Sequence, residues 1–199
     1  MKIIVDNNRK TKLISEIGCN HRGEFETALR MISVSSEYSD IIKFQKRNPK
    51  TLLSETEYNN PHPNPYHSYG STYGEHREHL EFTLSQHNEL KKYCEKLNRS
   101  YSCSVWDTDS AKDISSINID IIKIPSACNL NKDLLECVFK LHSKEIHISL
   151  GMTKRRDINK IIDFAESFNR NKDIVLYVCT SSYPSNSEDL YLKEIEFLK

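Results

Sequence analysis

The sequence predicts an α/β fold, an incomplete (β/α)₈ TIM barrel with about six parallel strands. Short runs rich in β-branched residues alternate along the chain with amphipathic stretches of helical period, which is the order of a parallel sheet covered by helices. A closed barrel of this type usually needs about 250 residues, whereas this chain has 199. We therefore expect one domain, residues 1–199, with fewer than eight strands.

Six segments have the composition of buried strands, and amphipathic stretches with apolar residues every three or four positions lie between them. The predicted strands are residues 13–18, 41–46, 101–106, 121–126, 146–151 and 174–180, and the clearest predicted helices are residues 25–37, 85–97, 131–142 and 155–168.

Two segments depart from this alternation. Residues 2–14 are predicted to form a β-hairpin that turns at Asp6, Asn7 and Asn8 and closes the floor of the barrel. Residues 59–81 are rich in Pro, Gly, Asn, His and Tyr and show no period, so we expect a long ordered loop after the second strand. Loops at that end of a barrel usually form the active site.

Composition excludes several classes of function. Lys plus Arg and Asp plus Glu both number 28, so no overall field attracts nucleic acid or an anionic membrane. No apolar stretch is long enough to span a bilayer, and the N-terminal apolar run has only four residues. We expect a cytoplasmic protein with no nucleic-acid or membrane partner. Its six cysteines are scattered singly, which indicates reduced thiols.

Polar residues gather where the predicted strands end. Because the carboxyl ends of parallel strands meet at one end of a barrel, we expect these side chains to share one mouth. They are Glu16, Asn20, His21, Lys43, Gln45, Ser104, Asp107, Lys123, Ser126, Ser149, Thr180, Ser181, Ser182 and Tyr183.

Lys43 and Lys123 are the most informative of these residues, because each is embedded among β-branched neighbours. A buried ammonium needs an anion, and lysines that converge with serine hydroxyls form a site for phosphate and carboxylate. The alternative is that each lysine pairs with an acidic residue or reaches the surface. Glu16 is either a general acid/base, a ligand for a sugar hydroxyl, or the partner of Lys43 in a buried salt bridge.

Seven blocks resemble, in the same order, those of bacterial N-acetylneuraminate (sialic acid) synthases and their legionaminic and pseudaminic acid relatives. The blocks are SEIGCNHRGEFETA, DIIKFQK, NPHPNPYHSYGSTYGEHREHLEFT, SCSVWDTDSAKDI, DIIKIPSACNLN, IHISLGMT and CTSSYPSNSEDLYL. The resemblance implies a transferase that condenses phosphoenolpyruvate with N-acetylmannosamine or a related acylamino sugar, giving a nonulosonic acid for lipopolysaccharide or capsule biosynthesis.

The resemblance also implies roles for individual residues. Those matching the family's phosphoenolpyruvate ligands are Lys43, Ser104, Lys123, Ser126, Ser149 and Ser181. Glu16 matches a carboxylate near the reacting carbons, so Glu16, Lys43 and Lys123 are the expected catalytic residues. Tyr183 matches a sugar contact, and Asn20, His21 and Gln45 are further candidates for substrate binding.

The family's divalent metal, Mn or Mg, is held by two histidines in Ser-Asp-His-Thr and Glu-Lys-His segments, to which no residue of this sequence corresponds. The five histidines between residues 62 and 87 fit no metal-ligand template, so no residue of this chain is assigned to a metal.

We expect the chain to end before strands 7 and 8 and to lack the small C-terminal antifreeze-like domain of the family's full-length homodimers. Alone, it is then expected to be weakly active or inactive. Two alternatives stay open. The chain is one half of a split synthase, or it is a non-catalytic phosphoenolpyruvate-binding protein.

Overall fold

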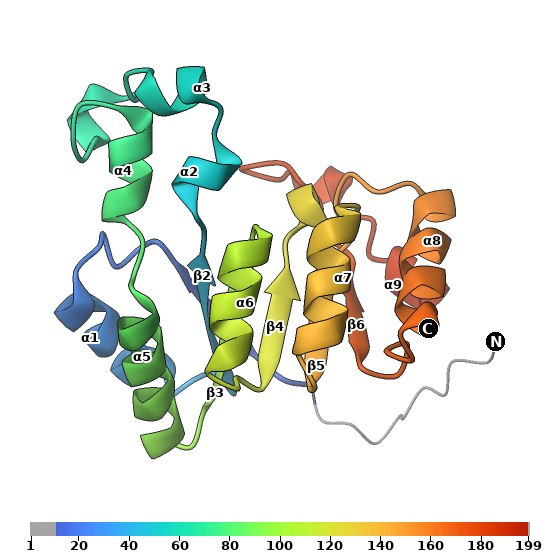
Figure 1. The fold of residues 1–199 in the computed structure, drawn as a ribbon. Helices are drawn as coiled ribbons and strands as arrows, with labels where there is room; N and C mark the ends of the chain where they lie inside the picture. The colour runs from blue at the N-terminus through green and yellow to red at the C-terminus, as the bar shows by residue number, and fades with distance from the viewer. Residues whose placement is uncertain (1–10, 199) are drawn as a thin grey trace.

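The computed structural model describes residues 11–198. Strands and helices alternate along most of the chain (Figure 1), in the order β1 Ile14–Gly18, α1 Phe25–Ser35, β2 Ile41–Lys46, α2 Pro49–Leu52, α3 Glu55–Asn59, η1 Pro65–His67, α4 Tyr73–His79, α5 Leu84–Lys96, β3 Ser100–Val105, α6 Thr108–Ser116, β4 Ile121–Ile124, η2 Ser126–Cys128, α7 Lys132–Leu141, β5 Glu145–Ser149, α8 Arg155–Ser167, β6 Ile174–Tyr177, η3 Ser187–Asp189 and α9 Glu194–Phe197.

The six strands form one parallel sheet in the order β1-β2-β3-β4-β5-β6, which confirms the predicted α/β class and strand count. Within residues 11–198, β6 does not pair with β1, so the sheet is open, as in an incomplete barrel. Figure 1 shows α6 and α7 lying against the sheet near β4 and β5, and α2, α3 and α4 above the ends of the strands. The β-strand → helix → β-strand order places every strand's carboxyl end at the same edge.

The main core lies between the sheet and its helices. Ile42, Phe44, Cys103 and Ile122 project from the strands and are fully buried. The helices present apolar residues three or four positions apart, as in α7, which buries Leu134, Leu135, Val138 and Phe139. Thus one face of each central strand contacts helices, and the alternate residues face the interior of the partial barrel.

The predicted elements agree with the structure to within a few residues, with two instructive differences among the strands. β4 ends at Ile124 because Pro125 follows and has no N–H to donate to the ladder. β6 ends at Tyr177, three residues before its predicted end, since its pairing with β5 stops at Ser149. Residues of β6 are only half-buried, whereas those of β4 are buried throughout.

The prediction of an unbroken loop over residues 59–81 is wrong, because this segment contains the helix α4. Thr72 caps its N-terminus, accepting from the backbone N–H of Glu75, whose carboxylate accepts in return from the backbone of Thr72. This capping box is a local signal that hydrophobic periodicity does not report. The predicted hairpin with its turn at residues 6–8 lies outside the described residues.

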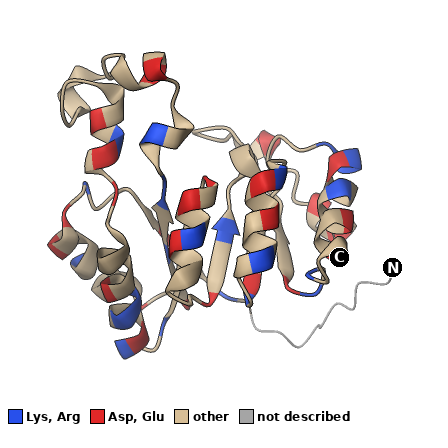
Figure 2. Cartoon of the chain, viewed as in Figure 1, with Lys and Arg blue, Asp and Glu red and all other residues tan. Residues whose placement is uncertain are grey.

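Other features of the described chain agree with its composition. All six cysteines are free. Figure 2 shows acidic and basic residues interspersed over the outer helices, with no face of one sign in this view. No helix in residues 11–198 has both the length and the apolar character needed to cross a bilayer.

Candidate functional site

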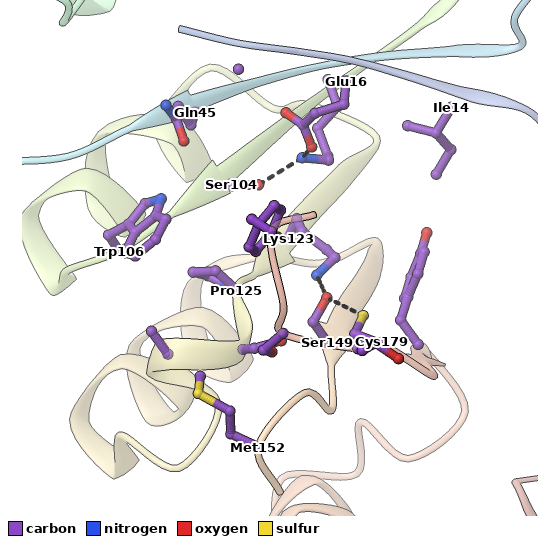
Figure 3. Close-up of a pocket in the computed structure, with 18 residues that line it drawn as sticks. Ile14, Glu16, Gln45, Ser104, Trp106, Lys123, Pro125, Ser149, Met152 and Cys179 are labelled. Carbon is purple, nitrogen blue, oxygen red and sulfur yellow. Dashed lines mark hydrogen bonds and ion pairs between the residues drawn. The ribbon is translucent and has the colours of Figure 1, made fainter. Parts of the chain in front are cut away.

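The strands' carboxyl ends enclose a cavity of about 640 Å³. Figure 3 shows side chains from several strands and from the turns that follow them converging on this space. The lining residues are Ile14, Glu16, Gly18, Lys43, Gln45, Ser104, Trp106, Lys123, Pro125, Ser126, Ala127, Ser149, Met152, Tyr177, Cys179, Thr180, Ser181 and Tyr183. We call this space the strand-end cavity.

Sheet register brings Lys43 to one wall of the strand-end cavity. Lys43 on β2 is paired in register with Glu16 on β1, and its ammonium forms an ion pair with the Glu16 carboxylate. The ammonium also donates a hydrogen bond to Ser104 Oγ at 3.0 Å. A register shift between Glu16 and Gly18 marks a β-bulge, the kind of irregularity that re-aims a side chain beside a site.

The Glu16–Lys43 ion pair corresponds to one of the alternatives left open by the sequence. It is not sealed from solvent, however, since the Glu16 side chain is 57% exposed while that of Lys43 is 11% exposed. An ion pair with one solvated partner can be opened at modest cost. Lys43 is therefore able to exchange the Glu16 carboxylate for an incoming anion.

Lys123 lies on β4, beside Ser104 in the register of β3 and β4, and is 5% exposed. Its ammonium donates hydrogen bonds to Ser149 Oγ and to the carbonyl oxygen of Ile124, the latter at 3.1 Å. Burial, reinforced by the positive charge of Lys43, lowers the pKa of Lys123 to about 8. No carboxylate within residues 11–198 forms an ion pair with Lys123, whereas Lys43 pairs with Glu16. The buried charge of Lys123 is therefore the less compensated of the two.

Gly151, just after β5, has no side chain, and two serine hydroxyls occupy the space that a Cβ would fill. A Cβ at this position would lie 2.2 Å from Ser181 Oγ and 2.7 Å from Ser126 Oγ, both far inside contact distance. The backbone N–H of Gly151 donates to Ser126 Oγ at 3.1 Å. The absent side chain thus allows segments after three different strands to place donors within a few ångströms of one another.

The strand-end cavity is chemically divided. In Figure 3, Gln45 and Trp106 lie at one side, whereas Lys123, Ser149 and Cys179 lie at the other. The second side combines a buried ammonium with hydroxyl donors, the groups that bind phosphate and carboxylate through charge-assisted hydrogen bonds. The first side offers an indole face and an amide, which suit a neutral, hydroxylated molecule.

Nine of the eleven site residues predicted from the sequence line the strand-end cavity: Glu16, Lys43, Gln45, Ser104, Lys123, Ser126, Ser149, Ser181 and Tyr183. They come from every strand of the sheet or the turn that follows it. Two lysines separated by eighty residues in the chain thereby share one cavity, because parallel strands of similar length end together.

Asn20 and His21 do not line the cavity, so their role in substrate binding stays a prediction without support from the cavity's geometry. Asn20 donates to the carbonyl oxygen of Ile17 at 2.9 Å and so closes a turn. His21 is 2% exposed and stacks on Phe82 with ring centroids 4.1 Å apart. Burial lowers the pKa of His21 to about 4, which keeps the ring neutral. Both residues stabilise the turn after β1.

Several lining residues were not singled out from the sequence. Trp106 follows β3, and Met152 follows Gly151 with a backbone φ of 62°. Tyr177 ends β6 and Cys179 follows two positions later, so both side chains point to the side of the cavity. Period-2 alternation from the predicted strand 174–180 was the available signal for both.

Within residues 11–198 there is no group of three or more His, Cys, Asp or Glu side chains arranged to hold a metal ion. The polar groups that line the cavity include the ammonium groups of Lys43 and Lys123, the Glu16 carboxylate, the Cys179 thiol and several hydroxyls.

The model of the NeuB family matches residues 31–199. Over 188 residues the chain is 32% identical to N-acetylneuraminate-9-phosphate synthase of Drosophila melanogaster, a match that covers 94% of this chain and 50% of that protein. It is 27% identical to N,N'-diacetyllegionaminic acid synthase of Campylobacter jejuni, covering 96% of this chain and 58% of the relative. The chain spans about half the length of the curated relatives it matches.

Among solved structures, the fold is similar to that of the N-acetylneuraminic acid (sialic acid) synthetase from Leptospira borgpetersenii. The TM-score is 0.82 at 24% identity, and the match covers 100% of this chain and 66% of that one. This likeness supports the partial-barrel description of the sheet.

The close approach at Gly151 predicts that Gly151→Ala weakens the binding of inorganic phosphate about tenfold, because the added methyl displaces the hydroxyls of Ser126 and Ser181 and removes hydrogen bonds to the anion. Titration calorimetry measures the affinity, and circular dichroism checks that the fold is retained. Ser167→Ala at the exposed end of α8 is the control. A folded Gly151→Ala chain that binds phosphate as well as the original would contradict the role given to this glycine.

Proposed function

Because this chain belongs to the NeuB family of sialic and other nonulosonic acid synthases, we propose that its strand-end cavity binds phosphoenolpyruvate and condenses it with N-acetylmannosamine or a related acylamino sugar. The observation that carries this proposal is the presence of two buried lysines, Lys43 and Lys123, in a single cavity with four serine hydroxyls. Phosphoenolpyruvate carries a phosphate and a carboxylate, so it matches this set of donors in charge.

Binding of an anion would compensate the buried charge of Lys123, which lacks a carboxylate partner in the free cavity. Lys123 has only neutral hydrogen-bond acceptors, and an anion next to it offsets the cost of burying its charge. The hydroxyls of Ser126 and Ser149 and the backbone around Gly151 then donate to the remaining oxygens. Lys43 contacts the ligand after loosening its pairing with Glu16.

In the proposed reaction, the methylene carbon of phosphoenolpyruvate forms a bond to the aldehyde carbon of the open-chain sugar. Water then adds to the adjacent carbon, the bond from that carbon to the phosphate oxygen breaks, and inorganic phosphate leaves. The product is an α-keto acid. Lys43 and Lys123, whose side-chain nitrogens line the cavity, are the proposed electrostatic partners of the leaving phosphate.

Glu16 is the proposed general acid/base. Its carboxylate lines the cavity, and an anion that takes over the Lys43 ammonium leaves this carboxylate free to exchange protons with the aldehyde oxygen or with water. Gln45, Trp106 and Tyr183 are the proposed sugar contacts. Tyr183 is 95% exposed and so lies at the entrance.

The remaining features expected from the resemblance are also proposals. A divalent metal, homodimerisation and a cytoplasmic location fit the proposed reaction, but no cluster of metal ligands within residues 11–198 holds the ion.

The decisive experiment mixes the chain with phosphoenolpyruvate, N-acetylmannosamine and manganese and follows both phosphate release and formation of the nine-carbon α-keto acid by mass spectrometry. Because the chain alone is expected to be weakly active at most, we expect slow turnover, with both products in equal amounts and neither without the sugar. Lys123→Met is the matched inactive control. Phosphate without the keto acid would identify a phosphatase, and no turnover together with no binding of phosphoenolpyruvate would refute the proposed function.

We predict that Lys43→Met and Lys123→Met each weaken phosphoenolpyruvate binding by about tenfold to a hundredfold, the range for losing a hydrogen bond to a charged group. Calorimetry measures the dissociation constants. Lys140→Met on α7 removes an exposed ammonium that pairs with Glu136 and serves as the control, with an unchanged constant expected. Equal affinities in all three variants would show that the anion binds elsewhere.

The affinity for phosphoenolpyruvate is expected to fall as pH rises through about 8, because burial lowers the pKa of Lys123 to that value and only the ammonium form attracts the anion. One pH unit above the pKa, about a tenth of the lysine remains charged, so the affinity at pH 9 is expected to be about tenfold below that at pH 7. Binding at pH 9 should also take up a proton, seen as a buffer-dependent enthalpy. A constant affinity from pH 7 to 9 would argue against Lys123 as the anion's main partner.

A further inference from the structure

A buried histidine and a half-buried tyrosine lie at the anion side of the strand-end cavity and have no assigned role in the proposed chemistry. His147 on β5 is 4% exposed, and its Nδ1 is 2.6 Å from the phenol oxygen of Tyr177 on β6. Its other nitrogen, Nε2, is 3.5 Å from a carboxylate oxygen of Glu145. A chain of polar contacts thus runs from Glu145, at the start of β5, through His147 to Tyr177 in the lining of the cavity.

This pair is adjacent to Lys123. His147 is the register partner of Lys123 across β4 and β5, and Tyr177 is the register partner of Ser149, whose hydroxyl accepts from the Lys123 ammonium. The Lys123 nitrogen lies 4.9 Å from the centroid of the Tyr177 ring, within the range of a cation–π contact. Tyr177 also lines the cavity itself.

From this geometry we infer that Tyr177 is a positioning residue for Lys123, with its ring face holding the ammonium at the anion site and His147 fixing the ring through the phenol. The inference deepens the proposed function and rests on it for the identity of the anion. The contact is chemically suited to the location, because an aromatic face stabilises a buried cation without neutralising it. A carboxylate in the same place would compete with the incoming phosphate.

Burial raises the pKa of Tyr177 to about 12, so the phenol is neutral and its ring remains an electron-rich face at physiological pH. The other titratable groups near Lys123 come from three strands. Lys43 on β2 opposes its charge, whereas Glu16 on β1 and Cys179 after β6 favour it. Because these groups lie in the same cavity, the test must change Tyr177 while leaving them in place.

The experiment labels the ε carbons of lysine with ¹³C and follows their chemical shifts against pH in the full chain, with the Lys123 signal assigned by its loss in Lys123→Arg. We expect Tyr177→Leu to shift the Lys123 titration midpoint downward by about half a pH unit or more, because the ammonium loses a cation–π contact. Tyr177→Phe keeps the ring but loses the hydrogen bond to His147, so a smaller shift is expected. The dissociation constant for phosphoenolpyruvate should rise about twofold or more in Tyr177→Leu at pH 8, because a midpoint lower by half a unit halves the charged fraction of Lys123.

A second set of variants keeps the size and shape of the ring nearly constant, so that a change in the Lys123 midpoint cannot be attributed to loss of the fold. In Tyr177→Phe variants whose ring carries zero, one, two or three fluorines, the midpoint should fall with each fluorine, since fluorine withdraws charge from the ring face. Tyr101→Phe is the matched control, because Tyr101 also pairs with a histidine: its phenol is 2.6 Å from Nδ1 of His87, on the helix-covered side of the sheet. It should leave the Lys123 midpoint unchanged.

Two results separate this inference from the proposed function. A midpoint that stays constant through the fluorinated series, or rises in Tyr177→Leu, overturns the role of Tyr177 even if the chain binds phosphoenolpyruvate. Conversely, a stepwise fall in a chain that fails to bind phosphoenolpyruvate supports the contact with Lys123 and refutes the identity of the anion.

Discussion

The placement of two lysine ammonium groups inside one end of a parallel sheet is the constraint on which the rest of this site depends. Lys43 and Lys123 are both nearly buried and line the same cavity, and the charge of Lys43 helps to lower the pKa of Lys123. Removing such groups from water is costly unless hydrogen bonds or opposite charge compensate them. Glu16 compensates Lys43, but Lys123 has only hydroxyl and carbonyl oxygens and a ring face.

This imbalance is the physical basis for proposing an anion as the ligand of the cavity. A carboxylate paired with both lysines would stabilise the fold and leave no cation for a ligand, whereas the observed arrangement keeps one ammonium partly uncompensated. The surrounding contacts then fix its position. Gly151 allows Ser126 and Ser181 to approach, and Tyr177 limits the space available to the Lys123 side chain. The site is therefore shaped as much by small and neutral residues as by charged ones.

Much of this organisation was accessible to reasoning from the sequence. Alternating strand and helix patterns predicted the parallel sheet, and ten of the polar residues predicted at strand ends line the cavity. The position of His21 shows what this reasoning misses. His21 follows β1 as a polar residue should, yet it stacks on Phe82, which lies sixty-one positions later in the sequence. A contact between segments so far apart does not alter the hydrophobic periodicity around either residue, so the sequence pattern cannot predict it.

By itself, the sequence determined the class of the fold, the order of its six strands and the residue types at their carboxyl ends, because hydrophobic periodicity and side-chain chemistry are local properties. Only the tertiary structure decided which of those residues meet: that Glu16 pairs with Lys43, that Gly151 admits two serine hydroxyls, and that Tyr177 faces Lys123. Strand register and the close packing of segments far apart in the chain set these distances, and neither is encoded in any single stretch of residues.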